Sequence, residues 1–434
     1  MKGPRWRRLC IGSALLGLAA GLPASAQILP SVGGVLGGLP DVGPTVDRAV
    51  DQTTGLAASA LDPQALLQDR TRRLRDLVRE NARSLEADAA GNPVVRGEVL
   101  AILPTPEALA AARAAGFVAL RQTALDELDL QAVVLAPPAG MSGPLAVSRL
   151  RHLDPGGQYD LNQLYFASGG PGGGDLAPSA DGLGAATDAR VGLIDTGVDA
   201  RLAVFAGVAI EQRGFAPGAP AGAAHGAATA SLIAGRLGAF HGAAPGARLY
   251  VADIYGAGPT GGSAEALARA LGWMAEIRAP VINVSLVGPP NALVAAAVRA
   301  LSARGARIIA AVGNDGPAAP LAYPASYPQV IAVTAVDARD RVLPEAGRAA
   351  HVDYAAPGAE MSAAGTGGGL AAVRGTSFAA PIVAGRLAKL LRAPNPTAAA
   401  SALMALDKEA RPAARGAAGH GVIGDDVRLA PPRH

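Results

Sequence analysis

From Arg190 onward, short apolar runs alternate with longer segments whose apolar residues recur at helical spacing. The runs are rich in Val, Ile and Ala, which is typical of strands buried on both faces. We therefore predict an α/β domain built on a doubly wound, mostly parallel sheet with helices on both faces. The predicted strands are Val191–Ile194, Leu249–Ile254, Val281–Ser285, Arg307–Val312 and Val330–Ala335, and the predicted helices are Ala227–Ala234, Ser263–Ile277, Ala292–Ala303 and Phe378–Leu391.

Residues 94–167 show a different order, in which helical and strand-like segments are shorter and more evenly mixed. Thr105 before Pro106 is typical of a helix start, because Thr caps free amides and Pro needs no donor there. The order suits a small α+β domain of the split βαβ type. Its predicted strands are Glu98–Leu103, Phe117–Gln122 and Leu130–Ala136, and its predicted helices are Thr105–Ala115 and Pro144–Leu153.

Two segments without a sheet pattern flank this small domain. Residues 27–93 form a leader, and within it Pro63–Ala89 has leucines at helical spacing with Arg and Glu between them. This pattern predicts an amphipathic helix that packs against another part of the protein. Residues 168–185 are rich in Gly and Pro and predict a linker. The larger domain, with a short C-terminal tail, then occupies residues 186–434.

The first 26 residues have the parts of a secretory signal peptide: a basic start, the apolar run Leu9–Leu22 and small residues at Ala24–Ala26. An uncleaved anchor is the alternative, but the run is short for a membrane span. Cleavage would lower Lys plus Arg from 38 to 34 against 35 acidic residues, changing the net charge from +3 to −1. It would also remove Cys10, the single cysteine. We expect an exported protein, periplasmic or secreted, with no nucleic-acid partner and no membrane attachment once mature.

Four polar residues stand at carboxyl ends of predicted strands or at starts of helices, where parallel sheets carry function. Asp195 and Asn314 follow strands, and His225 and Ser377 open helices. A serine becomes a nucleophile when a neutral imidazole accepts its proton, and a carboxylate orients that imidazole. An amide can donate a hydrogen bond to the oxyanion that forms. The four side chains therefore match the parts needed for acyl transfer.

Each of the four residues also has an ordinary structural interpretation. Asp195 and Asn314 are residue types that are common in turns, Ser377 suits a helix cap, and His225 suits a buried structural site. His225 differs from the other five histidines because it alone opens a helix within the α/β region. The occurrence of all four in this order favours a catalytic set over four independent structural residues.

Around these residues the chain resembles the subtilisin-like serine proteases, the subtilase family. The resemblance covers residues 186–425 and follows the family's order of Asp, His, Asn and Ser. The matching segments are VGLIDTGVD at Val191–Asp199, HGAATASLIAG at His225–Gly235, VINVSLVGP at Val281–Pro289, AAVGNDG at Ala310–Gly316, YAAPG at Tyr354–Gly358 and GTSFAAPIVAG at Gly375–Gly385.

The resemblance implies a role for each of the four residues: Asp195 orients the histidine, His225 is the general base, Ser377 is the nucleophile and Asn314 donates to the oxyanion. It also implies that residues 94–166 act as a propeptide, an intramolecular chaperone and inhibitor. Substrate would pair with the strand Ser285–Val287. The residues expected to bind substrate or line its pocket are Ser285, Leu286, Val287, Ala311, Val312, Gly313 and Ala322. Their small or apolar side chains favour an uncharged, hydrophobic residue before the scissile bond.

Some positions depart from the family's pattern. Ala227 stands where Thr is usual, Ile382 where His is usual, and Val287 where Gly is common, which would narrow the cleft. The segment Arg236–Gly246 lacks the insertion that forms a strong calcium site in well-known members. We therefore expect no cofactor, with calcium possible but unsupported.

The predicted function is that of an exported serine endopeptidase, acting as a monomer on protein or peptide substrates. An aspartic protease would need a second Asp-Thr-Gly motif beside Leu193–Gly197, and a metalloprotease would need His-Glu-x-x-His; the sequence has neither. The alternative is a protein that is not an enzyme: a catalytically silent subtilase fold that serves as a binding protein.

Overall fold

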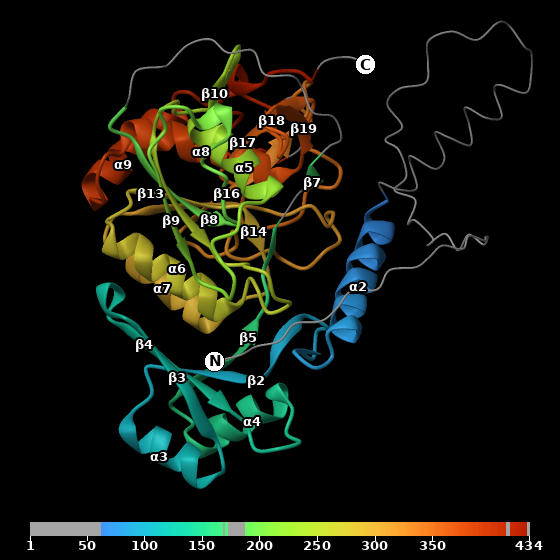
Figure 1. Cartoon of the computed structure of the whole chain (residues 1–434), viewed down its shortest axis with the longest axis vertical. Coiled ribbons are helices and arrows are strands. Elements are labelled where there is room, and N and C mark those ends of the chain that lie inside the picture. The colour runs from blue at the N-terminus through green and yellow to red at the C-terminus, as the bar shows by residue number, and fades with distance from the viewer. Residues whose placement is uncertain (1–61, 168–169, 172–186, 414–416, 432–434) are drawn as a thin grey trace, which may run out of the picture. The chain divides into compact units, whose positions relative to one another are not determined.

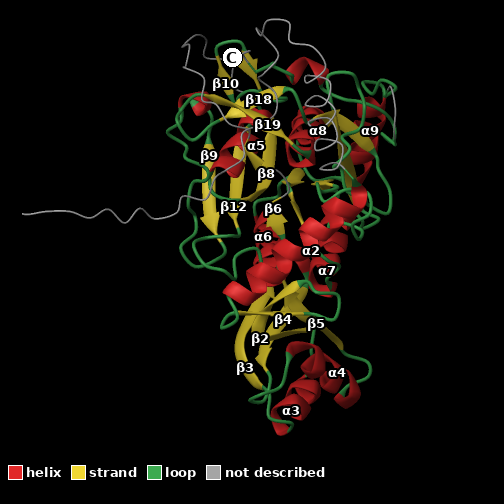
Figure 2. Cartoon of the chain, turned by 90° about the vertical axis from the view of Figure 1, so that its right-hand side faces the viewer, coloured by secondary structure: helices red, strands yellow, loops and turns green. Residues whose placement is uncertain are grey.

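The computed structural model describes residues 62–167, 170–171, 187–413 and 417–431. The predicted signal peptide, most of the leader and most of the linker lie outside the described residues. Figures 1 and 2 show the arrangement of the helices and strands.

The α/β domain is built on a seven-stranded sheet in the order β17-β16-β15-β13-β8-β12-β9. Every neighbouring pair is parallel. In that order, the strands are Tyr354–Pro357, Val330–Val336, Arg307–Ala311, Val281–Val284, Arg190–Asp195, Arg248–Asp253 and Ile210–Gly214. The predicted doubly wound, mostly parallel sheet is therefore confirmed.

Helices cover both faces of this sheet (Figure 2). Along β8, Leu193 belongs to one apolar core and Ile194 to the other, because successive side chains of a strand point to opposite faces. The first core includes α5 (Ala224–Ala234), α8 (Thr376–Leu390) and α9 (Pro396–Asp407). The second core includes α6 (Ala264–Glu276) and α7 (Ala292–Ala303).

Several elements of this domain were absent from the predicted pattern. The edge strand β9 alternates half-buried and exposed positions, and so gives no continuous apolar run. Helix α9 is rich in alanine and begins at Asn395, whose Oδ1 accepts from Ala398 N at 2.9 Å. The other short elements are β10 (Arg236–Leu237), β11 (Phe240–His241), β17, and the hairpin of β18 (Met361–Ala364) with β19 (Leu370–Arg374). β14 (Leu286–Val287), by contrast, lies within the expected strand Ser285–Val287.

The N-terminal domain, residues 85–163, has an antiparallel sheet in which β5 and β1 both pair with β2, followed by β4 and β3. Thr105 caps α3 as predicted, its Oγ1 accepting from Ala108 N at 3.1 Å. The elements are β1 (Leu85–Ala87), β2 (Pro93–Ile102), α3 (Pro106–Ala114), β3 (Val118–Leu125), β4 (Leu130–Ala136), α4 (Gly143–Leu153) and β5 (Gln158–Gln163).

Two predicted boundaries in this region need correction. The amphipathic helix α2 is Pro63–Glu80 and does not continue to Ala89. Asn81 ends it, and the chain then forms β1, which pairs with β2. Leu85 fits a helical spacing by sequence, but it is buried on the sheet. The N-terminal domain therefore begins within the range predicted as leader, before residue 94.

Two short strands continue from the N-terminal domain toward the α/β domain. β6 (Phe166–Ala167) pairs antiparallel with β14, and β7 (Gly170–Pro171) pairs antiparallel with β19. β7 lies within the range predicted as linker, so two of the linker residues are in fact paired in a sheet.

Candidate active site

Asp195 and His225 are in direct contact in the structure. Asp195 is the last residue of β8, and His225 is the second residue of α5. The Nδ1 atom of His225 lies 2.8 Å from Asp195 Oδ1 and 3.0 Å from Oδ2. Asp195 is 1% exposed and His225 9%, so the pair is shielded from water. A buried carboxylate in this position holds the imidazole in one orientation and stabilises its protonated form.

The start of α5 is packed tightly against the turn that follows Asp195. Gly226 N donates to Thr196 Oγ1 at 2.9 Å, and a Cβ at Gly226 would lie 2.5 Å from Thr196 O. Only glycine permits this close approach. One turn later, Thr229 Oγ1 lies 3.2 Å from Asp195 Oδ2, and Thr196 N donates to Asp195 Oδ1 at 2.6 Å. These contacts fix the carboxylate against the histidine.

Ser377 lies in the first turn of α8 and is fully buried. Pro381 follows four residues later inside the helix and has no N–H, so it cannot bond to the Ser377 carbonyl as an ordinary residue would. That carbonyl instead accepts a hydrogen bond from Ser285 Oγ at 2.9 Å. The proline thereby frees a carbonyl through which the end of β13 is tied to the serine turn.

Asn314 lies beside the start of α8. Its Oδ1 accepts from Thr376 N at 2.9 Å, and Thr376 Oγ1 bridges Gly313 N and Gly313 O at 3.0 and 3.1 Å. These bonds leave Asn314 Nδ2 as the free end of the amide. Asn314 Nδ2 and Ser377 Oγ are both buried with no hydrogen-bond partner among the described residues. A buried donor and a buried hydroxyl without partners are costly, which is typical of groups reserved for a ligand or a reaction.

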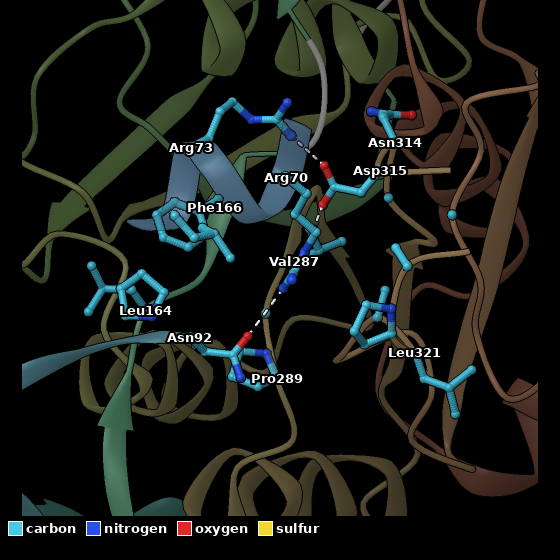
Figure 3. A pocket seen from close by; sticks show the side chains of 18 of the residues that line it. Arg70, Arg73, Asn92, Leu164, Phe166, Val287, Pro289, Asn314, Asp315 and Leu321 are labelled. Carbon is cyan, nitrogen blue, oxygen red and sulfur yellow. Dashed lines mark hydrogen bonds and ion pairs between the residues drawn. The ribbon is translucent and has the colours of Figure 1, made fainter. Parts of the chain in front are cut away.

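A pocket of about 740 Å³ opens beside Asn314 (Figure 3). Among the residues predicted to bind substrate, the pocket is lined by Val287, Val312, Gly313 and Ala322. Residues of the leader helix α2 and of β6 complete its wall.

Three predicted substrate-binding side chains do not reach this pocket: those of Ser285, Leu286 and Ala311 are fully buried. Leu286 precedes Val287 on β14, and alternation along the strand sends its side chain into the core. Ala311 ends β15 within the other core. The Ser285 hydroxyl holds the Ser377 carbonyl, so its side chain supports the serine turn.

Sequence reasoning did not identify Thr196, Thr229 and Thr376, which hold the candidate catalytic residues. Thr229 carried a usable signal, because a polar residue four positions after His225 lies on the same face of a helix. Thr196 and Thr376 are adjacent in sequence to Asp195 and Ser377, but their contacts are set by the meeting of separate loops.

A family model described as the subtilase family, Peptidase_S8, matches residues 186–420, which is more than half of the chain. This protein belongs to the subtilase family. M-protease from Shouchella clausii (strain KSM-K16) is 34% identical over 231 residues, covering 51% of this chain and 58% of its own length. Subtilisin Savinase from Lederbergia lenta is also 34% identical over 231 residues, covering 51% of this chain and 82% of its own.

The solved structure of fervidolysin from Fervidobacterium pennivorans, a keratinolytic enzyme related to subtilisin, aligns with a TM-score of 0.62 and 20% sequence identity. The alignment covers 79% of this chain and 62% of fervidolysin. The aligned 79% of the chain is more than residues 186–420 make up, so the likeness in fold extends beyond the part that the family model matches.

Two of the departures from the subtilase pattern, Ala227 and Ile382, lie in the core of this subtilase. Ala227 is 2% exposed and Ile382 is fully buried, and both belong to the same apolar core as α5 and α8. Gly424 packs on Ile382, where an added Cβ would lie 2.3 Å from Ile382 Cγ2. These substitutions therefore change packing and leave the Asp195–His225 contact in place.

The subtilase's own segment Leu164–Ala167 lies in the cleft between two stretches of the α/β domain. On one side, Tyr165 N donates to Gly262 O at 2.7 Å, and Leu164 forms an isolated antiparallel β-bridge with Ser263. On the other side, Phe166 and Ala167 pair with β14. The Tyr165 ring is fully buried, and its hydroxyl donates to Pro289 O at 2.9 Å. The segment thus occupies the place that an extended peptide would take.

Neither a metal site nor a membrane span is found in the described part of the chain. No group of three or more His, Cys, Asp or Glu side chains among these residues is placed to hold a metal ion. Among the helices of the same residues, none combines the length and the apolar character needed to cross a membrane.

Proposed function

We propose that this subtilase is an exported serine endopeptidase that cuts peptide bonds through an acyl-enzyme on Ser377. The observation that carries the proposal is the set of buried Asp195, His225 and Ser377 together with half-buried Asn314, whose Nδ2 atom is itself shielded from water. Their family roles agree with their contacts: the carboxylate holds His225 Nδ1, and the partnerless amide donor lies on a loop fixed to the serine turn.

In the proposed reaction, Ser377 Oγ attacks the peptide carbonyl and its proton passes to His225. The carbonyl oxygen becomes an oxyanion, to which Asn314 Nδ2 donates. The C–N bond then breaks, and the histidine returns the proton to the leaving amine. Water, deprotonated by the same histidine, hydrolyses the ester and restores the serine. Protonation of His225 in acid would remove the base, so the rate should fall as the pH is lowered.

Labelling with a serine-directed phosphonate tests the proposal. After the N-terminal region has been removed, the peptidase should incorporate one phosphonate at Ser377, and Ser377→Ala should incorporate none. A catalytically silent binding protein would remain unlabelled in both forms, which would refute the proposal.

The lining of the pocket supports a preference for an uncharged, hydrophobic residue before the scissile bond. Val287, Val312 and Ala322 present small or apolar side chains, and Val287 lies against Gly313, where an added Cβ would meet Val287 Cγ1 at 3.3 Å. A set of peptides that differ only at this residue should be cut with the highest kcat/KM when it is apolar and of moderate size. A preference for a basic residue would contradict this assignment.

The N-terminal domain would act as the propeptide, both inhibitor and chaperone. The segment Leu164–Ala167, the tail of this domain, would block access to Ser377. Because it is tethered to the chain, it binds at high effective concentration. Two side chains of β5 supply the missing partners of helix starts: Asn162 Oδ1 accepts from Glu265 N on α6 at 3.0 Å, and Asp160 Oδ2 accepts from Ala292 N on α7 at 2.8 Å. Capping of free amides stabilises helices, so these contacts would favour folding of the α/β domain.

The propeptide would be removed by Ser377 itself, between Tyr165 and Gly174. Pairing of β6 with β14 on one side and of β7 with β19 on the other favours a cut between Ala167 and Gly170. β19 runs directly into the serine turn, and β14 directly follows Ser285. Chains purified from a host without other proteases should start near Gly170 for the wild type and near Gln27 for Ser377→Ala. Equal sizes would contradict self-processing.

We propose that the mature protein is a monomer, periplasmic or secreted, and needs no metal. Incubation with EDTA should leave the activity within about twofold, because the Arg236–Gly246 segment lacks the family's calcium insertion. Loss of activity that calcium restores would overturn this part of the proposal.

A further inference from the structure

Helix α2 of the leader makes a polar contact beside the candidate oxyanion donor. Arg70 Nε lies 3.3 Å from Asp315 Oδ2, and Arg73 Nη2 lies 2.6 Å from Asp315 Oδ1. Figure 3 shows both guanidinium groups turned toward this one carboxylate. The Asp315 side chain is 25% exposed and that of Arg70 19%, so this contact is partly shielded from solvent. Asp315 directly follows Asn314.

The same face of α2 adds an apolar contact with the same loop. Leu66 packs on Gly316, where an added Cβ would lie 2.8 Å from Leu66 Cδ1. Leu66, Arg70 and Arg73 are spaced by four and three residues, so they lie on one side of the helix. Further along, Leu74 and Leu77 line the pocket together with Phe166.

The loop that α2 contacts is otherwise held from within the α/β domain. Gly347 N donates to Gly313 O at 2.7 Å, and Gly316 N donates to Glu345 O at 2.9 Å. Thr376 and Asn314 join the loop to the serine turn. Helix α2 therefore contacts a loop that is hydrogen-bonded to Thr376, the residue before the candidate catalytic serine.

We propose that α2 is a second inhibitory element, a clamp that closes the substrate pocket through the Arg70 and Arg73 ion pairs with Asp315. The inference rests on the proposed peptidase function but goes beyond a propeptide at residues 94–166. The tail at Leu164–Ala167 blocks the cleft by backbone pairing, and α2 covers the adjoining pocket with side chains. Activation then requires both to leave, and the charged contact makes the release of α2 depend on salt.

The experiment compares two double variants of the full chain. Arg70→Ala/Arg73→Ala removes both cations from Asp315. The matched control, Arg72→Ala/Arg79→Ala, removes two arginines of the same helix whose ion pairs, among the described residues, are with Asp69 and Asp76 of that helix. The lag before peptidase activity appears is followed with a small chromogenic peptide at low and high NaCl.

The clamp variant should shorten the lag about 2- to 30-fold at low salt, the range expected for two partly exposed ion pairs. High salt should shorten the lag of the wild type and of the control, and change that of the clamp variant little. The final rate should be the same in all three, because α2 has left by then. Equal lags and equal salt effects would overturn the clamp.

A second measurement does not depend on activity. Each double variant is combined with Ser377→Ala, so that the chain stays whole, and hydrogen exchange is measured for Gly313–Gly316. The clamp variant should exchange faster there than the control, and equal exchange would overturn the proposal. If exchange differs but no form ever gains activity, the clamp stands and the proposed peptidase function fails.

Discussion

The α/β domain and the N-terminal domain bury their sheets in different ways. The seven-stranded sheet is covered on both faces by helices of its own domain. The N-terminal sheet packs one face on α3 and α4, while Leu100, Ile102 and Val134 on its other face share a core with α6 and α7. Figure 1 shows α6 and α7 between the two sheets.

This difference agrees with the proposed division of the chain into a peptidase domain and an N-terminal domain that controls it. All four candidate catalytic residues lie on the α/β domain, so the proposed chemistry draws no side chain from the N-terminal domain. The N-terminal domain leaves an apolar face open when it is alone, and it is therefore expected to be stable chiefly when docked. The predictions below test this separation, beginning with the largest effect.

Ser377→Ala should lower kcat by about 10⁶, the loss that the corresponding substitution causes in subtilisin. The N-terminal domain should remain docked, because it does not contact this hydroxyl. The measurement is hydrolysis of a peptide substrate by the processed wild type and by the variant after removal of its propeptide with an added protease. Ser302→Ala is a matched control, since Ser302 Oγ is also buried without a hydrogen-bond partner among the described residues. Activity in Ser377→Ala comparable with the control would refute the assignment.

Asn314→Ala should lower kcat by about 10²–10³ with little change in KM, the magnitude known for the oxyanion donor of subtilisin. In the proposed role, the Asn314 amide would donate only to the charge that forms in the transition state, so ground-state binding should be kept. Steady-state kinetics on one peptide separates the two parameters. An effect mainly on KM would mean that Asn314 positions the substrate instead.

Arg121→Ala should weaken docking of the N-terminal domain without changing the processed enzyme. Arg121 Nε donates to Glu265 on α6 at 2.9 Å, and Nη1 donates to Glu98 at 2.8 Å. Hydrogen bonds to Glu98 and then to Glu265 raise the pKa of Arg121, so it stays charged at any ordinary pH. Its loss leaves the buried Glu265 carboxylate with Thr123 as a partner. We expect a loss of about 1–3 kcal/mol in stability of the uncut chain.

Thermal unfolding of Arg121→Ala, made in the Ser377→Ala background so that the chain stays uncut, measures this loss. Arg149→Ala is the control, because Arg149 is exposed on α4, a helix that packs on α3, β2 and β5 of the N-terminal domain. Equal melting temperatures for the two variants would show that the Arg121 network does not hold the domains together.

The smallest expected effect is an alkaline release of the tail. Burial and then the neighbouring Tyr327 raise the pKa of Tyr165 well above its ordinary value. The docked tail therefore binds with a neutral phenol, whereas the released tail ionises at about pH 10. Binding is complete below that pH and weakens as the pH rises above it. The lag before activity should shorten between pH 9 and 11 in the wild type and less in Tyr165→Phe. The same shortening in both would exclude Tyr165 as the cause.

The sequence was informative where short segments carry both structure and chemistry. Asp195, His225, Asn314 and Ser377 could be named as candidates because each follows a strand or opens a helix within a recognisable segment. Pocket residues were predicted less well, since Leu286 and Val287 are adjacent and only the direction of their side chains decides which one faces the pocket. Thr196 and Thr376 were missed because their contacts depend on parts of the chain that are distant in sequence.

The sequence by itself determined the central strands and helices, the parallel sheet and the choice of candidate catalytic residues, because the period of apolar positions and the chemistry of a motif are local properties. Tertiary structure alone decided which distant side chains meet. Arg73 and Asp315 are 242 residues apart, and Asn162 and Glu265 are 103 apart. No local pattern of charge distinguishes Arg73 from Arg72. Only the packing of α2 on the loop after Asn314 brings Arg73 to the Asp315 carboxylate, while Arg72 pairs with Asp69 on its own helix.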